Sequence, residues 1–301
     1  METNILLESG TNELEILVFN VGNNYYGINV AKISEIIPYQ KPTPIPNGHP
    51  CIEGIFMPRD TIFSIINLAK CLNFPEPEDC SKDMYIITNF NNLHTAFHVQ
   101  GVQGINRVSW ADIVTPDTTI NSSDRAVATG IIKCDGKLII ILDFEKIVSE
   151  INPETGLKVS DVDHIEAKNR SDFPIMIAED SPLLSSLICD CLHKAGFKDI
   201  IVNSNGKEAW DKLVDMRDNG TIDSKVKLVI TDIEMPQMDG HRLTKLIKED
   251  MVLQHIPVII FSSLINAEMR RKGEALGADA QLTKPEIGSL VLTIDGLLGI
   301  K

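Results

Sequence analysis

Residues 14 to 142 repeat one pattern, in which short runs of β-branched and other apolar residues are separated by residues that favour turns. The runs are Leu14–Asn20, Tyr26–Val30, Thr61–Ile66, Met84–Thr88, His94–Val99, Ala126–Cys134 and Lys137–Leu142. Strands at this spacing are typical of β-sandwiches and barrels. The first half of the chain is therefore predicted to be all-β.

The pattern changes after residue 173, where apolar runs alternate with segments that have helical spacing. The runs are Pro174–Ala178, Ile200–Val202, Leu228–Thr231, Pro257–Phe261 and Ala280–Thr283. Five such repeats predict an α/β domain, with a doubly wound, five-stranded parallel sheet that is covered by helices on both faces.

The residues between these halves mix Pro, Gly, Ser and Asn with charges of both signs, and they show no strand period. This composition indicates a linker at 153–172, although Asp161–Asn169 is also compatible with a short polar helix. The expected domains are therefore 11–152 and 173–300. A length of 301 residues agrees with two domains.

Charge and hydropathy narrow the possible partners. The formal charge is −14, and it divides into −8 for residues 1–160 and −6 for the remainder, so neither half offers a basic surface for nucleic acid. The longest apolar runs are far shorter than a bilayer span, which argues against membrane insertion. The start of the chain, Met1–Ser9, carries two Glu and no basic residue, and this is unlike a secretion signal. We expect a cytoplasmic protein.

The cysteines agree with a reducing compartment. They include no CxxC pair and have no histidine at zinc-finger spacing. Cys189 and Cys191 are the closest pair, but residues two apart on a helix point to different faces, which disfavours a shared metal or a disulfide. The six are Cys51, Cys71, Cys80, Cys134, Cys189 and Cys191.

Polar residues end the apolar runs of the second half. Glu179 and Asp180 follow the first run, Asp232 the third, Ser262 the fourth and Lys284 the fifth. Ligands of open α/β sheets bind beyond the carboxyl ends of the strands. Carboxylates gathered there repel one another unless a cation lies among them, and Mg²⁺ prefers such oxygen ligands. Any one of these carboxylates could instead cap the following helix.

This ordered set resembles the receiver domain of two-component response regulators over about residues 173–300. The matching segments are Ile175–Ser181 (IMIAEDS), Thr231–Gly240 (TDIEMPQMDG), Phe261–Ser263 (FSS) and Thr283–Pro285 (TKP). The resemblance implies a flavodoxin-like fold and a phosphoacceptor at Asp232. It also implies Mg²⁺ ligands at Glu179, Asp180, Asp232 and the Glu234 carbonyl, and phosphoryl-binding or switch positions at Ser262 and Lys284.

Three features depart from the usual receiver pattern. Glu179 replaces a more usual Asp and adds one methylene to the metal-binding side chain. Gln281 occupies a position where many relatives carry an aromatic switch residue, so a switch here must work without a ring. The polar segment Asp215–Lys225 lengthens the preceding region, and we interpret it as a loop extension.

Residues 1–150 show no catalytic constellation. His49, His94 and His98 have no nucleophile at a recognisable spacing, and isolated histidines are more often structural. The sequence resembles the CheW-like coupling domain of bacterial chemotaxis over about residues 11–152. The matching segments are Leu17–Gly22, Tyr26–Val30, Ile33–Ile37, Pro46, Gly54–Arg59, Phe63–Leu68 and Gly130–Asp143. Such domains are two small β-barrels that share a hydrophobic seam.

The same resemblance implies partners, because CheW-like domains join chemoreceptor tips to the histidine kinase CheA. Glu35 and Arg59 match positions that lie near the receptor-contacting surface in that family. Without the resemblance, the simpler interpretation is an ordinary exposed ion pair that contributes under about 1 kcal/mol.

A CheW-like domain followed by a receiver is similar to the CheV-type chemotaxis coupling proteins. The expected function is a non-enzymatic scaffold that couples chemoreceptors (methyl-accepting chemotaxis proteins) to CheA, is recruited to membrane receptor arrays and is modulated by phosphorylation of Asp232. A phosphate sink that competes for phosphoryl groups is the alternative. A transcription factor ranks last, because no helix-turn-helix follows the receiver.

Overall fold

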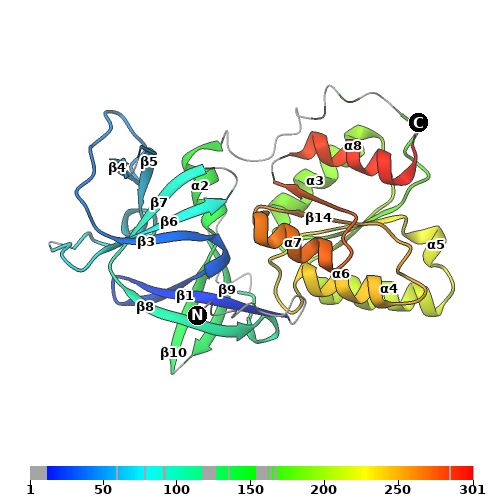
Figure 1. The fold of residues 1–301 in the computed structure, drawn as a ribbon, viewed down its shortest axis with the longest axis horizontal. Coiled ribbons are helices and arrows are strands. Elements are labelled where there is room, and N and C mark those ends of the chain that lie inside the picture. Colours follow the sequence, from blue (N-terminus) through cyan, green and yellow to red (C-terminus); the bar gives the residue numbers. More distant parts are fainter. Residues whose placement is uncertain are drawn as a thin grey trace. The chain divides into compact units, whose positions relative to one another are not determined.

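A computed structural model describes most of the chain, and it forms two compact units (Figure 1). One unit is Leu14–Thr155, and the other is built around Gly156–Lys301. The described residues are 12–58, 60–77, 79–90, 93–116, 127–134, 136–153, 162, 165, 168–284 and 286–300.

The first unit contains two five-stranded sheets. One has the order β8-β1-β2-β10-β9 and the other the order β3-β6-β7-β5-β4. The strands of the first sheet are β1 (Glu13–Val21), β2 (Asn24–Asn29), β8 (Val102–Ser109), β9 (Ala128–Cys134) and β10 (Lys137–Leu142). Those of the second are β3 (Ile33–Pro38), β4 (Ile52–Phe56), β5 (Phe63–Asn67), β6 (Met84–Phe90) and β7 (Leu93–Val99). The described helical elements are η1 (Val30–Lys32), α1 (Leu68–Cys71), η2 (Trp110–Asp112) and α2 (Phe144–Ile151).

Each of these sheets has a small apolar cluster of its own, and a third cluster joins them. Ile16 and Ile139 belong to the cluster of the first sheet, whereas Ile65 and Tyr85 belong to that of the second. The shared cluster contains side chains from both sheets and from α2, among them Phe19, Ile86, Phe97, Phe144 and Val148. This arrangement confirms the predicted all-β architecture with a shared hydrophobic seam.

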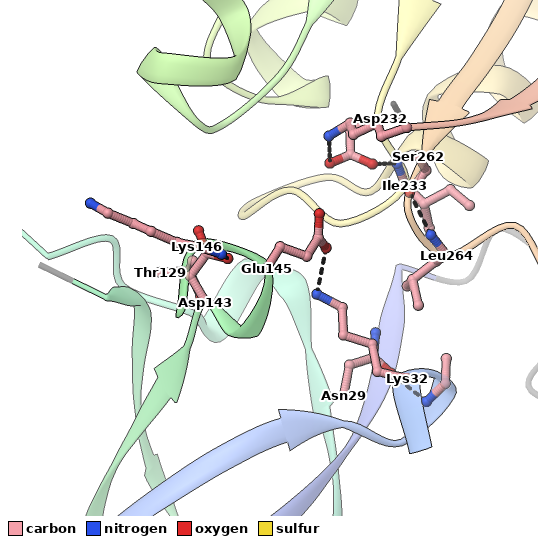
Figure 2. A network of polar contacts seen from close by, with 12 residues as sticks. Asn29, Lys32, Thr129, Asp143, Glu145, Lys146, Asp232, Ile233, Ser262 and Leu264 are labelled. Carbon is pink, nitrogen blue, oxygen red and sulfur yellow. Dashed lines mark hydrogen bonds and ion pairs between the residues drawn. The ribbon is translucent and has the colours of Figure 1, made fainter. Parts of the chain in front are cut away.

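A buried ion pair fastens α2 to the 3-10 helix η1 within this unit. The Lys32 ammonium lies 3.0 Å from Glu145 Oε1, and both side chains are largely buried (Figure 2). The Asp143 carboxylate begins α2 by accepting the Lys146 amide at 2.9 Å, which satisfies an otherwise unpaired helix N–H.

The second unit has one parallel sheet with the order β12-β11-β13-β14-β15. Its strands are β11 (Ile175–Ala178), β12 (Ile200–Asn203), β13 (Leu228–Thr231), β14 (Val258–Ser262) and β15 (Ala280–Thr283). The helices are α3 (Pro182–Ala195), α4 (Gly206–Asp218), α5 (Ile222–Lys225), α6 (Gly240–Glu249), α7 (Ala267–Ala275) and α8 (Ile287–Leu298). The expected five-stranded parallel sheet is confirmed.

Alternate residues of the central strands face opposite layers of helices. In β11, Ile175 and Ile177 pack with α3 and α8, whereas Met176 and Ala178 pack with α4 and α6. Figure 1 shows these helix pairs on opposite sides of the sheet. Burial on both faces explains why the central strands are continuous apolar runs in the sequence.

The interpretation of Asp215–Lys225 as a loop extension is wrong. Residues up to Asp218 continue α4, and α5 begins at Ile222 after a short turn. Ile222 is buried in the same apolar cluster as Val226, so the segment packs onto the unit through an apolar contact. Arg217 also forms an ion pair with Asp250.

Part of the expected linker belongs structurally to the second unit. Arg170 is fully buried and binds Asp295 of α8 with two hydrogen bonds of 2.8 Å, while its third nitrogen donates to the Ala195 carbonyl at 2.6 Å. Val162 is buried in the same apolar core as α8. Among the described residues, no helix is both long and apolar enough to cross a membrane.

Candidate functional site

Three carboxylates meet at the carboxyl ends of two neighbouring strands. Glu179 and Asp180 follow β11, and Asp232 follows β13, which is paired with β11 in register. One carboxylate oxygen of each residue lies within 4.8 Å of the others. Glu179 and Asp232 are buried, whereas Asp180 is half-buried. The sequence-predicted carboxylates are therefore brought together at one edge of the sheet.

Lys284 lies among these carboxylates. Its side chain follows β15, is 5% exposed, and places Nζ 2.8 Å from Glu179 Oε2 and 2.8 Å from Asp232 Oδ2. One ammonium thus faces two buried carboxylates, with a third close by. The site retains an excess of negative charge, and a divalent cation would offset it.

Backbone amides fix the orientation of Asp232. Its Oδ1 accepts the Ile233 amide at 2.6 Å (Figure 2). The Asp232 amide donates to the Ala178 carbonyl at 3.0 Å. Because Lys284 binds Oδ2, each carboxylate oxygen has a different partner. The carboxylate is therefore held in one orientation before any ligand arrives.

Electrostatics indicate that the site is built for a positive ligand. Burial raises the pKa of Glu179 to about 7; Lys284 opposes this rise and Asp232 adds to it. A cation placed among the carboxylates would reverse this effect and keep Glu179 ionised. Carboxylate oxygens are hard donors, so Glu179, Asp180 and Asp232 suit a hard divalent ion.

Ser262 ends β14 next to the site and is fully buried. Its hydroxyl oxygen accepts the Leu264 amide at 3.3 Å (Figure 2), and its carbonyl accepts the Lys284 amide at 3.3 Å. Ser262 thus joins the loop after β14 to the residue that contacts the carboxylates.

Gln281 is buried in β15 and is bound to α7. Its Nε2 donates to the Arg270 carbonyl at 2.7 Å. Its Oε1 is buried without a hydrogen-bond partner in the described part of the chain. A Cβ placed on Gly273 would lie 2.3 Å from this Oε1, so the glycine leaves room for the amide.

Gly240, whose role sequence reasoning missed, is required by the backbone geometry around Asp232. A Cβ at Gly240 would lie 1.8 Å from the Asp232 carbonyl oxygen, closer than any side chain permits. Its amide donates to the Ile233 carbonyl at 3.0 Å. Asp239 caps α6 by accepting the Arg242 amide at 2.7 Å. The Asp-Gly pair before an amphipathic segment was the available sequence signal.

The structure gives less information on the other predicted positions, Glu234, Glu35 and Arg59. Glu234 is half-buried two residues after Asp232, and the role of its carbonyl stays a prediction. Glu35 is exposed on β3, at one end of its sheet. Arg59 lies outside the described residues, and the role of both residues in partner binding stays a prediction.

Comparison with known families matches both halves of the chain. Residues 15–152 match the CheW-like domain, and residues 175–295 match the response regulator receiver domain. The matched segments coincide with the all-β unit and with the unit that holds the acidic site. Neither description names a catalytic domain.

Curated relatives match the same two-part organisation. The Helicobacter pylori chemotaxis protein CheV3 is 30% identical over 264 residues, which covers 86% of this chain and 84% of the relative. CheV2 of the same organism is 28% identical over 298 residues and covers 92% of each chain. The Thermotoga maritima chemotaxis protein CheW is 31% identical over 153 residues, covering 50% of this chain and 98% of the relative.

Proposed function

The chain belongs to the CheV family of chemotaxis coupling proteins, and we propose on this basis that it couples chemoreceptors to the histidine kinase CheA under the control of Asp232 phosphorylation. The observation that carries the proposal is the presence of a CheW-like unit and a receiver with Glu179, Asp180, Asp232 and Lys284 in one chain. The protein is thus a coupling adaptor regulated by phosphorylation.

The phosphate-sink alternative is not favoured. A sink needs only the receiver, whereas the CheV relatives align over both halves of the chain. The CheW relative, in contrast, aligns with about half of the chain, as expected for a coupling domain that is also found alone. A protein that retains both parts is better suited to regulated coupling.

The phosphoryl group would be accepted by Asp232. An Asp232 carboxylate oxygen forms a bond to phosphorus while the bond between phosphorus and the donor histidine nitrogen of CheA breaks. Lys284, 2.8 Å from Asp232, supplies positive charge for the transferred oxygens. Mg²⁺ held by Glu179, Asp180, Asp232 and the Glu234 carbonyl would neutralise charge on the phosphoryl group during transfer.

Phosphorylation would act on the loop after β14. The Ser262 hydroxyl can serve the phosphoryl oxygens only if its loop moves inward, and that loop leads into α7. Gln281 ties α7 to β15, so movement of either element is transmitted to the other. We therefore propose that the switch acts through the surface of α7 and β15, without an aromatic ring.

Glu35 and Arg59 are proposed to contribute to the partner-binding surface of the CheW-like unit. Exposure of Glu35 on β3 supports this role. Recruitment to membrane receptor arrays then follows from binding to receptors and does not require a membrane span of its own.

Reconstitution of receptors, CheA and this protein tests the function. We expect wild type to support receptor-controlled kinase activity, and the Asp232→Asn variant to support it while losing the change that follows phosphorylation. Asp223→Asn is the matched control, because Asp223 is exposed on α5 of the same unit. Failure of wild type to support any receptor-controlled kinase activity would contradict the coupling function.

A further inference from the structure

Three potential metal ligands converge inside the CheW-like unit, away from the acidic site of the receiver. Cys80 and Asp83 belong to the segment before β6, and His98 is on β7. The Cys80 sulfur, one Asp83 oxygen and one His98 ring nitrogen all lie within 4.8 Å of one another. Asp83 and His98 are buried, while Cys80 is half-buried and gives access to the cluster.

A carboxylate on β4 fixes which nitrogen of His98 faces the cluster. Glu53 Oε2 lies 2.7 Å from His98 Nδ1, and Asp83 Oδ2 lies 2.9 Å from Nε2. Ligand histidines in metal sites commonly donate their second ring N–H to a carboxylate, which sets the tautomer and the ring orientation. Glu53 occupies that position at Nδ1, which leaves Nε2 to face Asp83.

The surroundings hold these groups in place. The His98 ring stacks on Tyr39 with centroids 4.8 Å apart, and Tyr85 meets it edge-on at 5.6 Å. The Asp83 amide donates to the Cys80 carbonyl at 3.1 Å, which forms a tight turn, and the Tyr39 amide donates to the Asp83 carbonyl at 3.0 Å. Cys80 and Asp83 therefore come from a hydrogen-bonded turn, and His98 comes from a central strand where two tyrosine rings pack against it.

We infer that Cys80, Asp83 and His98 form a Zn²⁺ site, with Glu53 as the carboxylate that positions His98. Sulfur, imidazole nitrogen and carboxylate oxygen are the ligand types that Zn²⁺ takes, and the half-buried side of Cys80 leaves the fourth position to water. One thiolate and one carboxylate balance the two positive charges. Binding displaces the thiol proton and any proton on Nε2, both of which pass to solvent.

Such a site would join the segment before β6 to β7. The same contacts also permit a metal-free arrangement, in which a protonated His98 lies between Glu53 and Asp83. The two arrangements differ in one measurable respect. Only the metal site requires a Cys80 thiolate bonded to the ion.

Cobalt titration of the intact chain distinguishes them. The reduced protein is stripped with chelator and supplied with excess Mg²⁺, which occupies the receiver site, before Co²⁺ is added. We expect one equivalent to produce a thiolate-to-cobalt charge-transfer band in the near ultraviolet, and Zn²⁺ to abolish the band by displacing Co²⁺. A wild-type protein without this band, or with a band that Zn²⁺ leaves unchanged, would overturn the assignment in favour of the ion pair.

Variants locate the site. Cys80→Ser should lose the band, and Glu53→Gln should keep it with about 10- to 100-fold weaker Co²⁺ binding, the usual effect of removing such a supporting carboxylate. Cys51→Ser is the matched control, since Cys51 is a half-buried thiol of the same unit that lies next to Cys71. A band that survives Cys80→Ser or vanishes in Cys51→Ser refutes the site. Far-ultraviolet circular dichroism confirms that each variant is folded.

Discussion

Arg170 and Asp295 form a bidentate ion pair inside the receiver unit, with Nε 2.8 Å from Oδ1 and Nη2 2.8 Å from Oδ2. Arg170 precedes β11 in the chain and Asp295 is on α8, so the pair fastens the entry of the receiver to its last helix. Lys168 also reaches Asp295, at 3.1 Å.

Removal of one partner should destabilise the receiver. Arg170→Met leaves Asp295 with only the half-exposed Lys168, and loss of one partner of a buried pair typically costs about 3–5 kcal/mol. Urea unfolding of the intact chain, followed by a receiver probe such as Trp210, measures this. The double variant Arg170→Met with Asp295→Leu should recover stability. A cost below about 1 kcal/mol for Arg170→Met would contradict a stabilising role.

The same pair predicts an acid-dependent loss of stability. Burial alone favours the neutral acid, but hydrogen bonds from Arg170 and Lys168 outweigh it and lower the pKa of Asp295. A carboxylate with a lowered folded pKa stabilises the protein above its unfolded pKa of about 3.9 and loses this effect as the pH falls through the folded value. Below about pH 4, the unfolding free energy of Arg170→Met should therefore vary less with pH than that of wild type.

His241 predicts a second pH effect, at milder acidity. Burial, followed by the influence of Lys272, lowers the pKa of His241 to about 4, and its Nε2 has no hydrogen-bond partner in the described structure. As the pH falls from about 6.5 to 4, the unfolded chain gains a proton that the folded one does not, and about 3 kcal/mol of stability is lost.

The difference between wild type and His241→Leu isolates this contribution from other titrating groups. The variant should show a flatter dependence of unfolding free energy on pH between 4 and about 6.5. His255→Gln, at an exposed histidine of the same unit, serves as the control and should follow wild type. Parallel curves for wild type and His241→Leu would show that His241 does not resist protonation in the fold.

Asp180→Ala should weaken Mg²⁺ binding by at least about tenfold, which corresponds to about 1.4 kcal/mol, because it removes one of three carboxylates that gather at the site. Isothermal titration calorimetry at constant ionic strength measures the affinity. Asp223→Asn is again the control, at a carboxylate outside the site. Equal affinities for Asp180→Ala and wild type would remove Asp180 from the ligand set.

Gly240→Ala should disturb the backbone at Asp232 without changing the Asp232 side chain. The added Cβ meets the Asp232 carbonyl oxygen at 1.8 Å, so the backbone must shift, and strain of this kind costs about 1–3 kcal/mol or more. We expect lower stability and slower phosphorylation by CheA. Gly296→Ala is the matched control, because its Cβ would have no neighbour within 4 Å. Equal behaviour of the two variants would be inconsistent with the close approach.

Glu35→Ala and Arg59→Ala should each weaken binding of residues 14–155 to receptor or CheA while leaving the unit folded. The unit has its own apolar clusters, which supports its folding in isolation. Surface-immobilised receptor or kinase fragments provide the binding measurement, with circular dichroism as the test of folding. A folded variant with unchanged affinity for both partners would exclude that residue from the surface.

The receiver site was predictable from sequence because its residues end buried strands. β11 and β13 are apolar throughout, so the first polar residues after them, Glu179 and Asp232, marked the functional edge of the sheet. Lys284 could be assigned because it directly follows the last run, although β15 itself is only partly buried. The hydrogen bonds that orient Asp232 form only in the folded chain and leave no signal in the sequence.

The strands of the first unit were harder to predict from the sequence. No run was predicted for β3, β4 or β8, because these strands are largely half-exposed and mix polar with apolar residues. In β8, every second residue is exposed over most of its length, so it lacks the apolar run that marked its neighbours.

The cysteine and histidine cluster was missed for a different reason. Glu53, Cys80 and His98 are far apart in the chain and meet only because β4, β6 and β7 belong to one sheet. Spacing rules detect ligands within one turn or loop, and sheet pairing that joins distant segments leaves no such signal. The proposed site rests on topology that sequence spacing does not encode.

Gln281 of β15 packs against Gly273 of α7 and is also hydrogen-bonded to that helix, so the two elements are linked. An aromatic side chain at this position could change rotamer without breaking a hydrogen bond. The Gln281 amide donates to the Arg270 carbonyl of α7, so it must break that bond before it can change rotamer. A movement that keeps this bond should therefore carry α7 and β15 together, whereas a movement of one element alone must first break it.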